Sequence, residues 1–191
     1  MQDLKKLLDL ECDYRMEDKT MDEFVSLMSE VRLKNGEALI SYGQFDDNVY
    51  IVKQGLMRSV YFDGLKEITF GFCAPGTLFI QYHSYYNRMP SFFQYESCGN
   101  STIMKVLKSD FDALLESSHD FLKWMYRMQA AQFWFYEMKL SVINGTAEER
   151  FDSLVRNRPE IIEKVSSKVI ASYLGITPSS LSRLKRKKSF Q

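Results

Sequence analysis

The sequence has few of the residues that bind metal ions or form disulfides. Its 191 residues include three cysteines, which are scattered and form no Cys-X-X-Cys pair, and only two histidines. A zinc or iron–sulfur centre needs several such ligands at close spacing, so we expect no metal and no metal cofactor. An odd number of cysteines also argues against a disulfide framework and favours a reducing, cytoplasmic location.

Long apolar runs and leader-like features are absent as well. No stretch approaches the ~18 consecutive apolar residues of a membrane-spanning helix. No signal peptide is recognisable, so a membrane is not an expected partner. Apolar residues still make up 45% of the sequence, which is enough to build the cores of one or two domains.

Acidic residues are missing from the C-terminal end. The formal net charge of the chain is zero, but residues 146–191 hold ten Lys and Arg against five Asp and Glu. Residues 167–191 contain six basic residues and no acidic one. A basic end of this kind is typical of a surface that binds nucleic-acid phosphates, although a solvated tail has the same composition.

A two-helix pattern lies within this basic end, at residues 167–184. Gly175 separates two short helical stretches and can adopt the positive φ that a tight turn needs. Thr177 can cap the second helix, and Pro178 suits its first turn. Apolar residues at helical spacing face each other across the turn, namely Ile170, Leu174, Leu181 and Leu184. This spacing predicts a DNA-binding helix-turn-helix.

The outward side of the second helix carries small hydroxyls and cations. A guanidinium can pair with guanine O6 and N7 in the major groove, so we expect Arg183 to read a base. An ordinary helical hairpin inside an enzyme is the alternative interpretation. The residues predicted to contact DNA are Thr177, Ser179, Ser180, Ser182, Arg183, Lys185, Arg186, Lys187 and Lys188.

Upstream, residues 31–107 have the composition and glycine spacing of a β structure. Short runs rich in β-branched and aromatic residues alternate with glycines, and Asp63-Gly64 is a strong hairpin signal. Regular short strands with glycine turns predict a small antiparallel barrel or roll. The predicted strands are 38–42, 49–53, 57–62, 67–72, 92–97 and 102–107. Before them, Thr20 and Glu23 have the spacing of a capping box that would open a helix through about residue 29.

The longest uninterrupted helical stretch runs from Asp120 to about Ile143 and contains no Gly or Pro. Apolar residues at alternating spacings of four and three predict a heptad seam for dimerisation, although a helix buried in one subunit has the same pattern. The seam residues are Trp124, Met128, Ala131, Phe135, Met138 and Val142. Asn144-Gly145 ends this helix, and Thr146 with Glu149 forms a capping box for the next one.

The order of roll, long helix and helix-turn-helix resembles the Crp–Fnr superfamily of bacterial transcription regulators, from about residue 20 to the end. The matching segments are Leu33–Glu37, Tyr50–Leu56, Ala74–Phe79 and the helix-turn-helix. The resemblance looks closest to the cyclic-nucleotide-binding-domain-like regulators of Bacteroidetes-type bacteria. It implies a homodimer on a two-fold-related double-stranded DNA site, with RNA polymerase as a further partner and an unidentified small molecule as effector.

The resemblance also implies an α+β fold in three parts. An N-terminal antiparallel β-roll domain of the cyclic-nucleotide-binding type, with helices before it, would span residues 1–119. A dimerisation helix would span residues 120–143. A helix-turn-helix DNA-binding domain would span residues 144–191.

Two features depart from the family pattern. Members that bind cyclic AMP hold its phosphate and sugar with a Gly-Glu pair and an Arg-Ser or Arg-Thr pair, where this chain has Ile80-Gln81 and Ser91-Phe92. Arg88 is out of register, so a cyclic phosphate would lack its ion pair. Many members also continue after the recognition helix with a β-hairpin wing, whereas here a basic tail follows it, so wing contacts are not expected.

The aromatic stretch at residues 82–86 therefore has two interpretations. It lines a pocket for a flatter and less charged effector, or it forms roll core around a vestigial pocket. The candidate pocket residues are Gln81, Tyr82, His83, Arg88 and Ser91.

Two other classes of function compete with a dimeric transcription regulator. An effector-binding or oligomerisation module would use the helical tail without reading DNA, but the outward Arg183 argues against it. An enzyme with a cupin-like roll would need clustered His and carboxylate ligands, and two histidines far apart in sequence argue against it.

Overall fold

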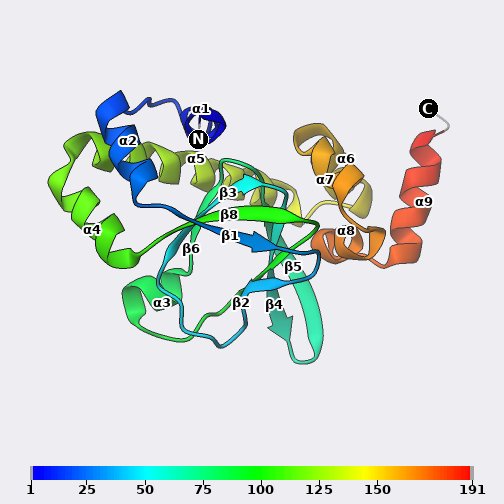
Figure 1. Cartoon of the computed structure of the whole chain (residues 1–191). Coiled ribbons are helices and arrows are strands. Elements are labelled where there is room, and N and C mark those ends of the chain that lie inside the picture. Colours follow the sequence, from blue (N-terminus) through cyan, green and yellow to red (C-terminus); the bar gives the residue numbers. More distant parts are fainter. Residues whose placement is uncertain (1, 190–191) are drawn as a thin grey trace.

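A computed structural model describes residues 2–189, with side chains described for residues 3–187. Its centre is a roll of two four-stranded antiparallel sheets (Figure 1). The first sheet has the order β1 (Ser29–Leu33), β8 (Ser101–Val106), β3 (Val49–Gln54) and β6 (Leu78–Ile80). The second has the order β2 (Ala38–Ile40), β7 (Gln94–Ser97), β4 (Met57–Asp63) and β5 (Lys66–Cys73).

The strands form where β-branched and aromatic residues are concentrated, because both faces of the central strands are buried. In β3 the residues from Val49 to Val52 are all buried, and in β4 those from Met57 to Val60. The hairpin predicted at Asp63-Gly64 is confirmed, since Asp63 pairs with Lys66 across the turn. Side chains from the two sheets meet in one core cluster, which includes Ile40, Tyr50, Val52, Met57, Phe79, Tyr95 and Ile103.

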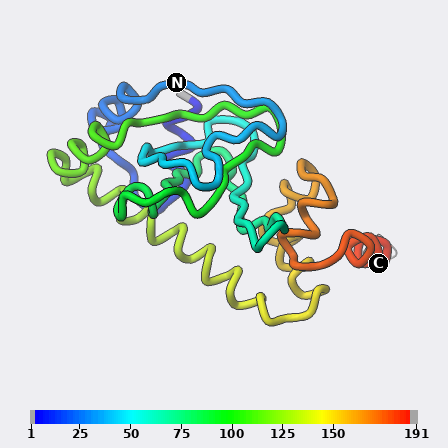
Figure 2. The backbone as a smooth tube through the Cα atoms, turned by 90° about the horizontal axis from the view of Figure 1, so that it is seen from below, coloured from blue at the N-terminus to red at the C-terminus, as the bar shows by residue number. Residues whose placement is uncertain are grey.

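Helices surround the roll at both ends of the chain. Along the chain, α1 (Gln2–Leu10) and α2 (Asp18–Ser26) come before the roll, α3 (Tyr82–Asn87) lies between two of its strands, and α4 (Lys108–Ser117) follows its last strand. The long helix α5 (His119–Ile143) follows and runs from beside α4, along the roll, to the C-terminal helices (Figure 2). None of the helices described is long and apolar enough to cross a membrane.

The first half of α5 is a core element of its own subunit. Phe121 and Trp124 stack at 5.6 Å between ring centroids, and both rings contact Phe24 of α2. Trp124 and Met128 are completely buried. The assignment of these two residues to the dimer seam is therefore wrong. The helix has the predicted apolar periodicity, but Trp124 and Met128 face the roll of the same chain.

Two further differences concern the N-terminal part. The capping box predicted at Thr20 does not form, because α2 begins at Asp18 and Thr20 is a buried residue inside the helix. The short edge strand β6 and most of β1 were not predicted. Strands of three to five residues depend on pairing with distant segments more than on their own composition.

Four helices complete the chain, α6 (Ala147–Asn157), α7 (Pro159–Lys164), α8 (Ser167–Leu174) and α9 (Pro178–Ser189). The capping box of Thr146 and Glu149 at the start of α6 is confirmed, with both reciprocal hydrogen bonds present. These helices share a core to which the roll contributes Leu56. The residue bounds predicted for the three domains remain a prediction.

Gly55, in the turn between β3 and β4, should tolerate no side chain. Its φ is +95°, and an added Cβ would lie 2.2 Å from Ser101 Oγ and 2.7 Å from Ser101 Cα. We expect Gly55→Ala to lower the free energy of unfolding by at least about 2 kcal/mol, measured by urea denaturation.

Gly36→Ala is the matched control, because Gly36 also has a positive φ, of +78°, but no atom within 4 Å of the added Cβ. Only backbone strain remains there, so we expect a loss of about 1 kcal/mol. Equal losses in the two variants would show that Ser101 yields and that the contact does not matter.

Candidate nucleic-acid interface and roll cavity

Helices α8 and α9 form the predicted helix-turn-helix geometry. The Ser166 hydroxyl caps α8 by accepting from the Val169 N–H at 3.5 Å, and Gly175 closes the helix in the left-handed conformation at φ +65°. Thr177 caps α9, its Oγ1 accepting from the Ser180 N–H at 3.1 Å. Leu181 is completely buried against Ile170 and Leu174 in the shared core. The turn therefore fixes α9 at an angle to α8, on the outer side of the molecule (Figure 1).

The outward side of α9 presents a short polar surface. Ser179, Ser182, Arg183 and Arg186 are all exposed. The Arg183 guanidinium donates from Nη2 to Ser180 Oγ at 3.2 Å, which holds the arginine along the helix at its solvent side. An exposed guanidinium flanked by small hydroxyls can reach base edges, because no bulky neighbour keeps the helix away from a groove.

The other residues predicted to contact DNA have partners within the protein. The Thr177 and Ser180 hydroxyls lie 2.9 Å apart at the helix cap. Lys185 Nζ donates to Ser167 Oγ at 3.4 Å, and Lys187 pairs with Glu148 of α6 at 2.9 Å. The Lys188 side chain lies outside the described residues.

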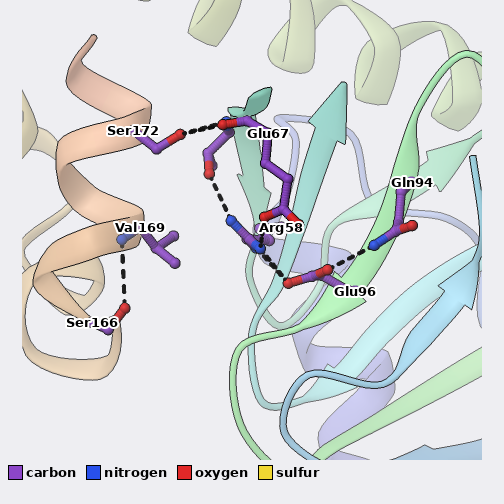
Figure 3. Close-up of polar contacts among 8 residues, drawn as sticks. Arg58, Glu67, Gln94, Glu96, Ser166, Val169 and Ser172 are labelled. Carbon is purple, nitrogen blue, oxygen red and sulfur yellow. Dashed lines mark hydrogen bonds and ion pairs between the residues drawn. The ribbon is translucent and has the colours of Figure 1, made fainter. Parts of the chain in front are cut away.

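The first helix of this unit docks on the edge of the second sheet (Figure 3). Ser172 of α8 accepts a hydrogen bond from the Thr69 N–H at 3.0 Å and donates to the Glu67 carbonyl at 3.3 Å. Thr69 and Glu67 belong to β5, which is an edge strand of its sheet. The Ser172 hydroxyl thus satisfies one main-chain donor and one main-chain acceptor, both of which would otherwise be unpaired on an edge strand.

An ion-pair network beneath this contact stiffens the same strand. The Arg58 side chain, on β4, is only 10% exposed and binds Glu96 at 2.5 Å and Glu67 at 3.2 Å. It also donates to Thr69 Oγ1 at 3.0 Å. Figure 3 labels Arg58 with its two carboxylate partners, Glu67 and Glu96. Because its guanidinium is held by three side chains, the buried charge is paired rather than left without a partner.

Lys139 of α5 joins three parts of the protein. Its ammonium donates to the Phe70 carbonyl of β5. It also lies 4.4 Å from the centre of the Phe70 ring and 4.6 Å from that of Tyr173 on α8. Burial lowers the pKa of Lys139 to about 8, so the side chain is still mostly protonated at neutral pH. The Lys139 ammonium of α5 therefore contacts both the roll and the helix-turn-helix.

A cavity of about 320 Å³ opens between the roll and α5. Of the five predicted pocket residues, Gln81, Tyr82 and His83 line it. Arg88 and Ser91 do not: Arg88 ends α3 on the exposed surface, and the buried Ser91 hydroxyl donates to the Phe93 carbonyl. The lining residues that the sequence did not reveal are Phe70, Ile80, Phe92, Phe93, Tyr95 and Tyr136.

The polar side chains of this cavity are three tyrosines, an amide and an imidazole. Burial raises the pKa of Tyr136 to about 12 and raises those of Tyr82 and Tyr95 as well. The Tyr82 hydroxyl donates to Gln129 Oε1 at 2.7 Å, and Gln81 Nε2 donates to the Phe93 carbonyl at 2.5 Å. No Lys, Arg, Asp or Glu is among the residues that line the cavity.

The exposed side of α5 carries a second apolar feature. Tyr126, Phe133 and Leu140, which are seven residues apart, are 71%, 64% and 61% exposed. Since an α-helix has 3.6 residues per turn, they lie on one side, and Tyr126 is about 200° around the axis from the buried Trp124. On the predicted seam, Phe135 and Met138 are 48% and 36% exposed, and Ala131 and Val142 are half-buried.

Comparison with known proteins identifies the fold. Residues 30–118 match the family model described as the cyclic nucleotide-binding domain. FixK2 from Bradyrhizobium japonicum superposes with a TM-score of 0.69 at 20% identity, covering 86% of this chain and 85% of its own. A regulator of the crp/fnr family from Eubacterium rectale gives a TM-score of 0.68 at 15% identity, covering 92% of this chain and 84% of its own. The chain therefore shares the fold of these structures and contains a roll of the cyclic nucleotide-binding type.

A third structure extends the likeness over nearly the whole of both chains. CLP from Xanthomonas campestris, described as a c-di-GMP responsive global regulator, has a TM-score of 0.73 at 13% identity and covers 91% of this chain and 92% of its own. No curated protein matches the sequence. At identities this low the likeness concerns the fold of a Crp–Fnr protein, and function has to be argued from the sites. The narrower resemblance to Bacteroidetes-type regulators stays a prediction.

Removal of the Ser172 hydroxyl should loosen the docking of α8. In Ser172→Ala the Thr69 N–H and the Glu67 carbonyl lose their partner, which costs about 1–3 kcal/mol if they stay covered. We expect the Thr69 amide to exchange with solvent deuterium faster than in the wild-type protein. Ser141→Ala is the control, because the exposed Ser141 hydroxyl bonds only within α5, to the Met138 carbonyl. An unchanged Thr69 rate in Ser172→Ala would mean that apolar contacts alone hold α8.

Proposed function

We propose that this Crp–Fnr protein is a homodimeric, sequence-specific DNA-binding transcription regulator without enzymatic activity. The observation that carries the proposal is the outward surface of α9. This helix is held by a buried Leu181 and exposes Ser179, Ser182, Arg183 and Arg186 on its other side. These are residue types that fit a major groove and bind base edges and phosphates.

The charge distribution supports the same proposal. Arg183, Arg186 and Lys168 are exposed cations on the two helices of the helix-turn-helix, and neither α8 nor the described part of α9 contains an acidic residue. The chain as a whole has zero net charge, so cations concentrated on the helix-turn-helix attract nucleic acid to that part of the protein. Lys187 contributes less than its position suggests, because Glu148 already neutralises it.

Dimerisation is proposed through the exposed stripe of α5, which consists of Tyr126, Phe133 and Leu140. A single subunit leaves these side chains mostly in water, and their seven-residue spacing suits a parallel helix pair. A second copy packed along this stripe would bring two α9 helices into a two-fold arrangement, as half-sites in successive major grooves require. RNA polymerase is a further proposed partner, on the resemblance alone.

The roll is proposed as a sensor that does not use cyclic AMP. Its cavity has no cation to hold a phosphate, and the two positions that should hold the nucleotide carry Gln81 and Ser91. Selection of bound duplexes from a random pool, with the full chain, tests the function directly. An enriched sequence with two-fold symmetry supports it, and retention of all duplexes alike contradicts sequence-specific reading.

Arg183→Ala should weaken binding to the selected site by about 1–3 kcal/mol and relax the preference at one base pair in each half-site. Titration of fluorescent duplexes with each base substituted in turn measures both effects. Arg156→Ala is the control, because Arg156 is an exposed arginine of α6 in the same C-terminal unit. An equal loss of affinity on random DNA would instead make Arg183 a phosphate contact.

Phe133→Glu should convert the dimer to a monomer, because two carboxylates would face each other across the helix pair. Sedimentation at micromolar concentration measures the change. Leu65→Glu, at the fully exposed tip of the hairpin between β4 and β5, is the control and should remain dimeric. A wild-type protein that sediments as a monomer would refute the proposed stripe.

A further inference from the structure

The roll cavity is small, aromatic and uncharged. Its volume of about 320 Å³ lies near the lower end of the roughly 300–1,000 Å³ range of ligand pockets. Six of its nine lining residues are Phe or Tyr, none is Lys, Arg, Asp or Glu, and the His83 Nδ1 lies 3.3 Å from the Pro90 carbonyl. Walls of this kind fit a compact ligand with an aromatic ring better than a nucleotide.

Two cations, Lys139 and Arg88, come from elements next to this cavity, but neither is placed to pair with an anionic ligand inside it. Lys139 directs its ammonium to the Phe70 carbonyl and lies between the rings of Phe70 and Tyr173, on the side of Phe70 that faces α8. Arg88 lies outside the lining. An anion against these walls would lose water without gaining an ion pair to Lys or Arg, so the cavity disfavours phosphates and carboxylates.

The geometry of the walls favours a planar ligand. The Phe70 ring lies 5.0 Å from that of Phe93 at 38° and 5.9 Å from that of Tyr136 at 33°. These rings pack against one another, and an aromatic ring of a ligand would extend this cluster in an offset-stacked arrangement. The tyrosine hydroxyls, whose pKa values burial raises, stay protonated at neutral pH and can donate to an oxygen of the ligand.

One wall residue connects the cavity to the docked helix-turn-helix. Phe70 of β5 lines the cavity, and its ring and carbonyl also hold Lys139, which in turn contacts Tyr173 of α8. One residue earlier on the same strand, the Thr69 amide binds Ser172 of α8. The cavity is present with α8 docked, so a ligand that fits it favours the docked arrangement over an undocked one.

We propose that this cavity binds an uncharged, planar compound of one or two aromatic rings, and that its occupancy holds α8 against β5. A regulatory role for this ligand rests on the proposed function, whereas the binding of the ligand does not depend on it. In this proposal, stacking and neutral hydrogen bonds take the place of the nucleotide contacts that the family resemblance implies.

Calorimetric titration of the full-length protein without DNA tests the ligand class. The probes are 2-naphthol, its carboxylate counterpart 2-naphthoate, its saturated counterpart decahydro-2-naphthol, and cyclic AMP. We expect 2-naphthol to bind at least about tenfold more tightly than the other three, because only this probe is both planar and uncharged, and each tenfold step corresponds to about 1.4 kcal/mol.

Matched variants locate the binding. Tyr136→Ala should weaken the binding of 2-naphthol by about tenfold or more, since it removes one wall ring. Tyr42→Ala is the control, because Tyr42 is an exposed tyrosine that does not line the cavity. Thermal unfolding of each variant in the absence of probe shows whether it is folded. Binding that survives in a folded Tyr136→Ala variant overturns the assignment of the site.

Hydrogen exchange of the Thr69 amide tests the effect on docking. With 2-naphthol at 100 times its dissociation constant, stabilisation of the docked state should slow this exchange by up to about a hundredfold. An unchanged rate in the saturated protein overturns the coupling.

Preferred binding of 2-naphthoate or cyclic AMP, or no binding of any probe, overturns the ligand class. Because none of these measurements contains DNA, they separate this proposal from the DNA-binding function. A protein that binds 2-naphthol but selects no duplex contradicts only the proposed function.

Discussion

The burial of the first half of α5 against the roll fixes the positions of the other parts. Phe121, Trp124 and Met128 are completely buried there, and each large side chain that leaves water contributes on the order of 1.5–3 kcal/mol. This packing fixes the rotation of α5 about its own axis. Tyr136 and Lys139 consequently lie at β5, whereas Tyr126, Phe133 and Leu140 face solvent. One helix thus supplies a wall of the cavity and the exposed stripe through which dimerisation is proposed.

Strand β5 is the structural link between the roll and the helix-turn-helix. As an edge strand it exposes main-chain donors and acceptors, which invite pairing with other chains unless they are covered. Ser172 covers one donor and one acceptor, and Tyr173 packs on Phe72 with ring centroids 5.1 Å apart. The same strand supplies Phe70 to the cavity. A change at the cavity wall and a change in the docking of α8 therefore act on neighbouring residues of one strand.

Charged side chains are arranged differently in the roll and in the C-terminal helices. Inside the roll, charge is either paired, as in the Arg58 network, or excluded from the cavity. On α9, exposed cations extend into solvent, where their field reaches over a distance set by the ionic strength, as the proposed binding of phosphates requires. The cavity without Lys, Arg, Asp or Glu and the cationic surface of α9 thus lie in separate parts of the chain.

The sequence by itself determined the features that depend on a few neighbouring residues. The left-handed Gly175, the Thr177 cap, the Thr146 capping box and the Asp63-Gly64 hairpin follow from local backbone preferences, and the structure has all four. The length of α5 followed equally from an uninterrupted helical stretch, since the predicted start and end lie within one residue of those observed.

Only the tertiary structure decided which partner each surface meets. Helical periodicity shows that Trp124 and Met128 share an apolar side, but a roll and a second helix satisfy that side equally well, so only folding shows that these two residues face the roll. The cavity unites Phe70, Phe93 and Tyr136 from three distant segments, and no local spacing records that meeting. Lys187 reads as a phosphate contact until Glu148 is found beside it. Local preferences act through the backbone of adjacent residues, whereas burial and charge pairing depend on neighbours that only folding brings together.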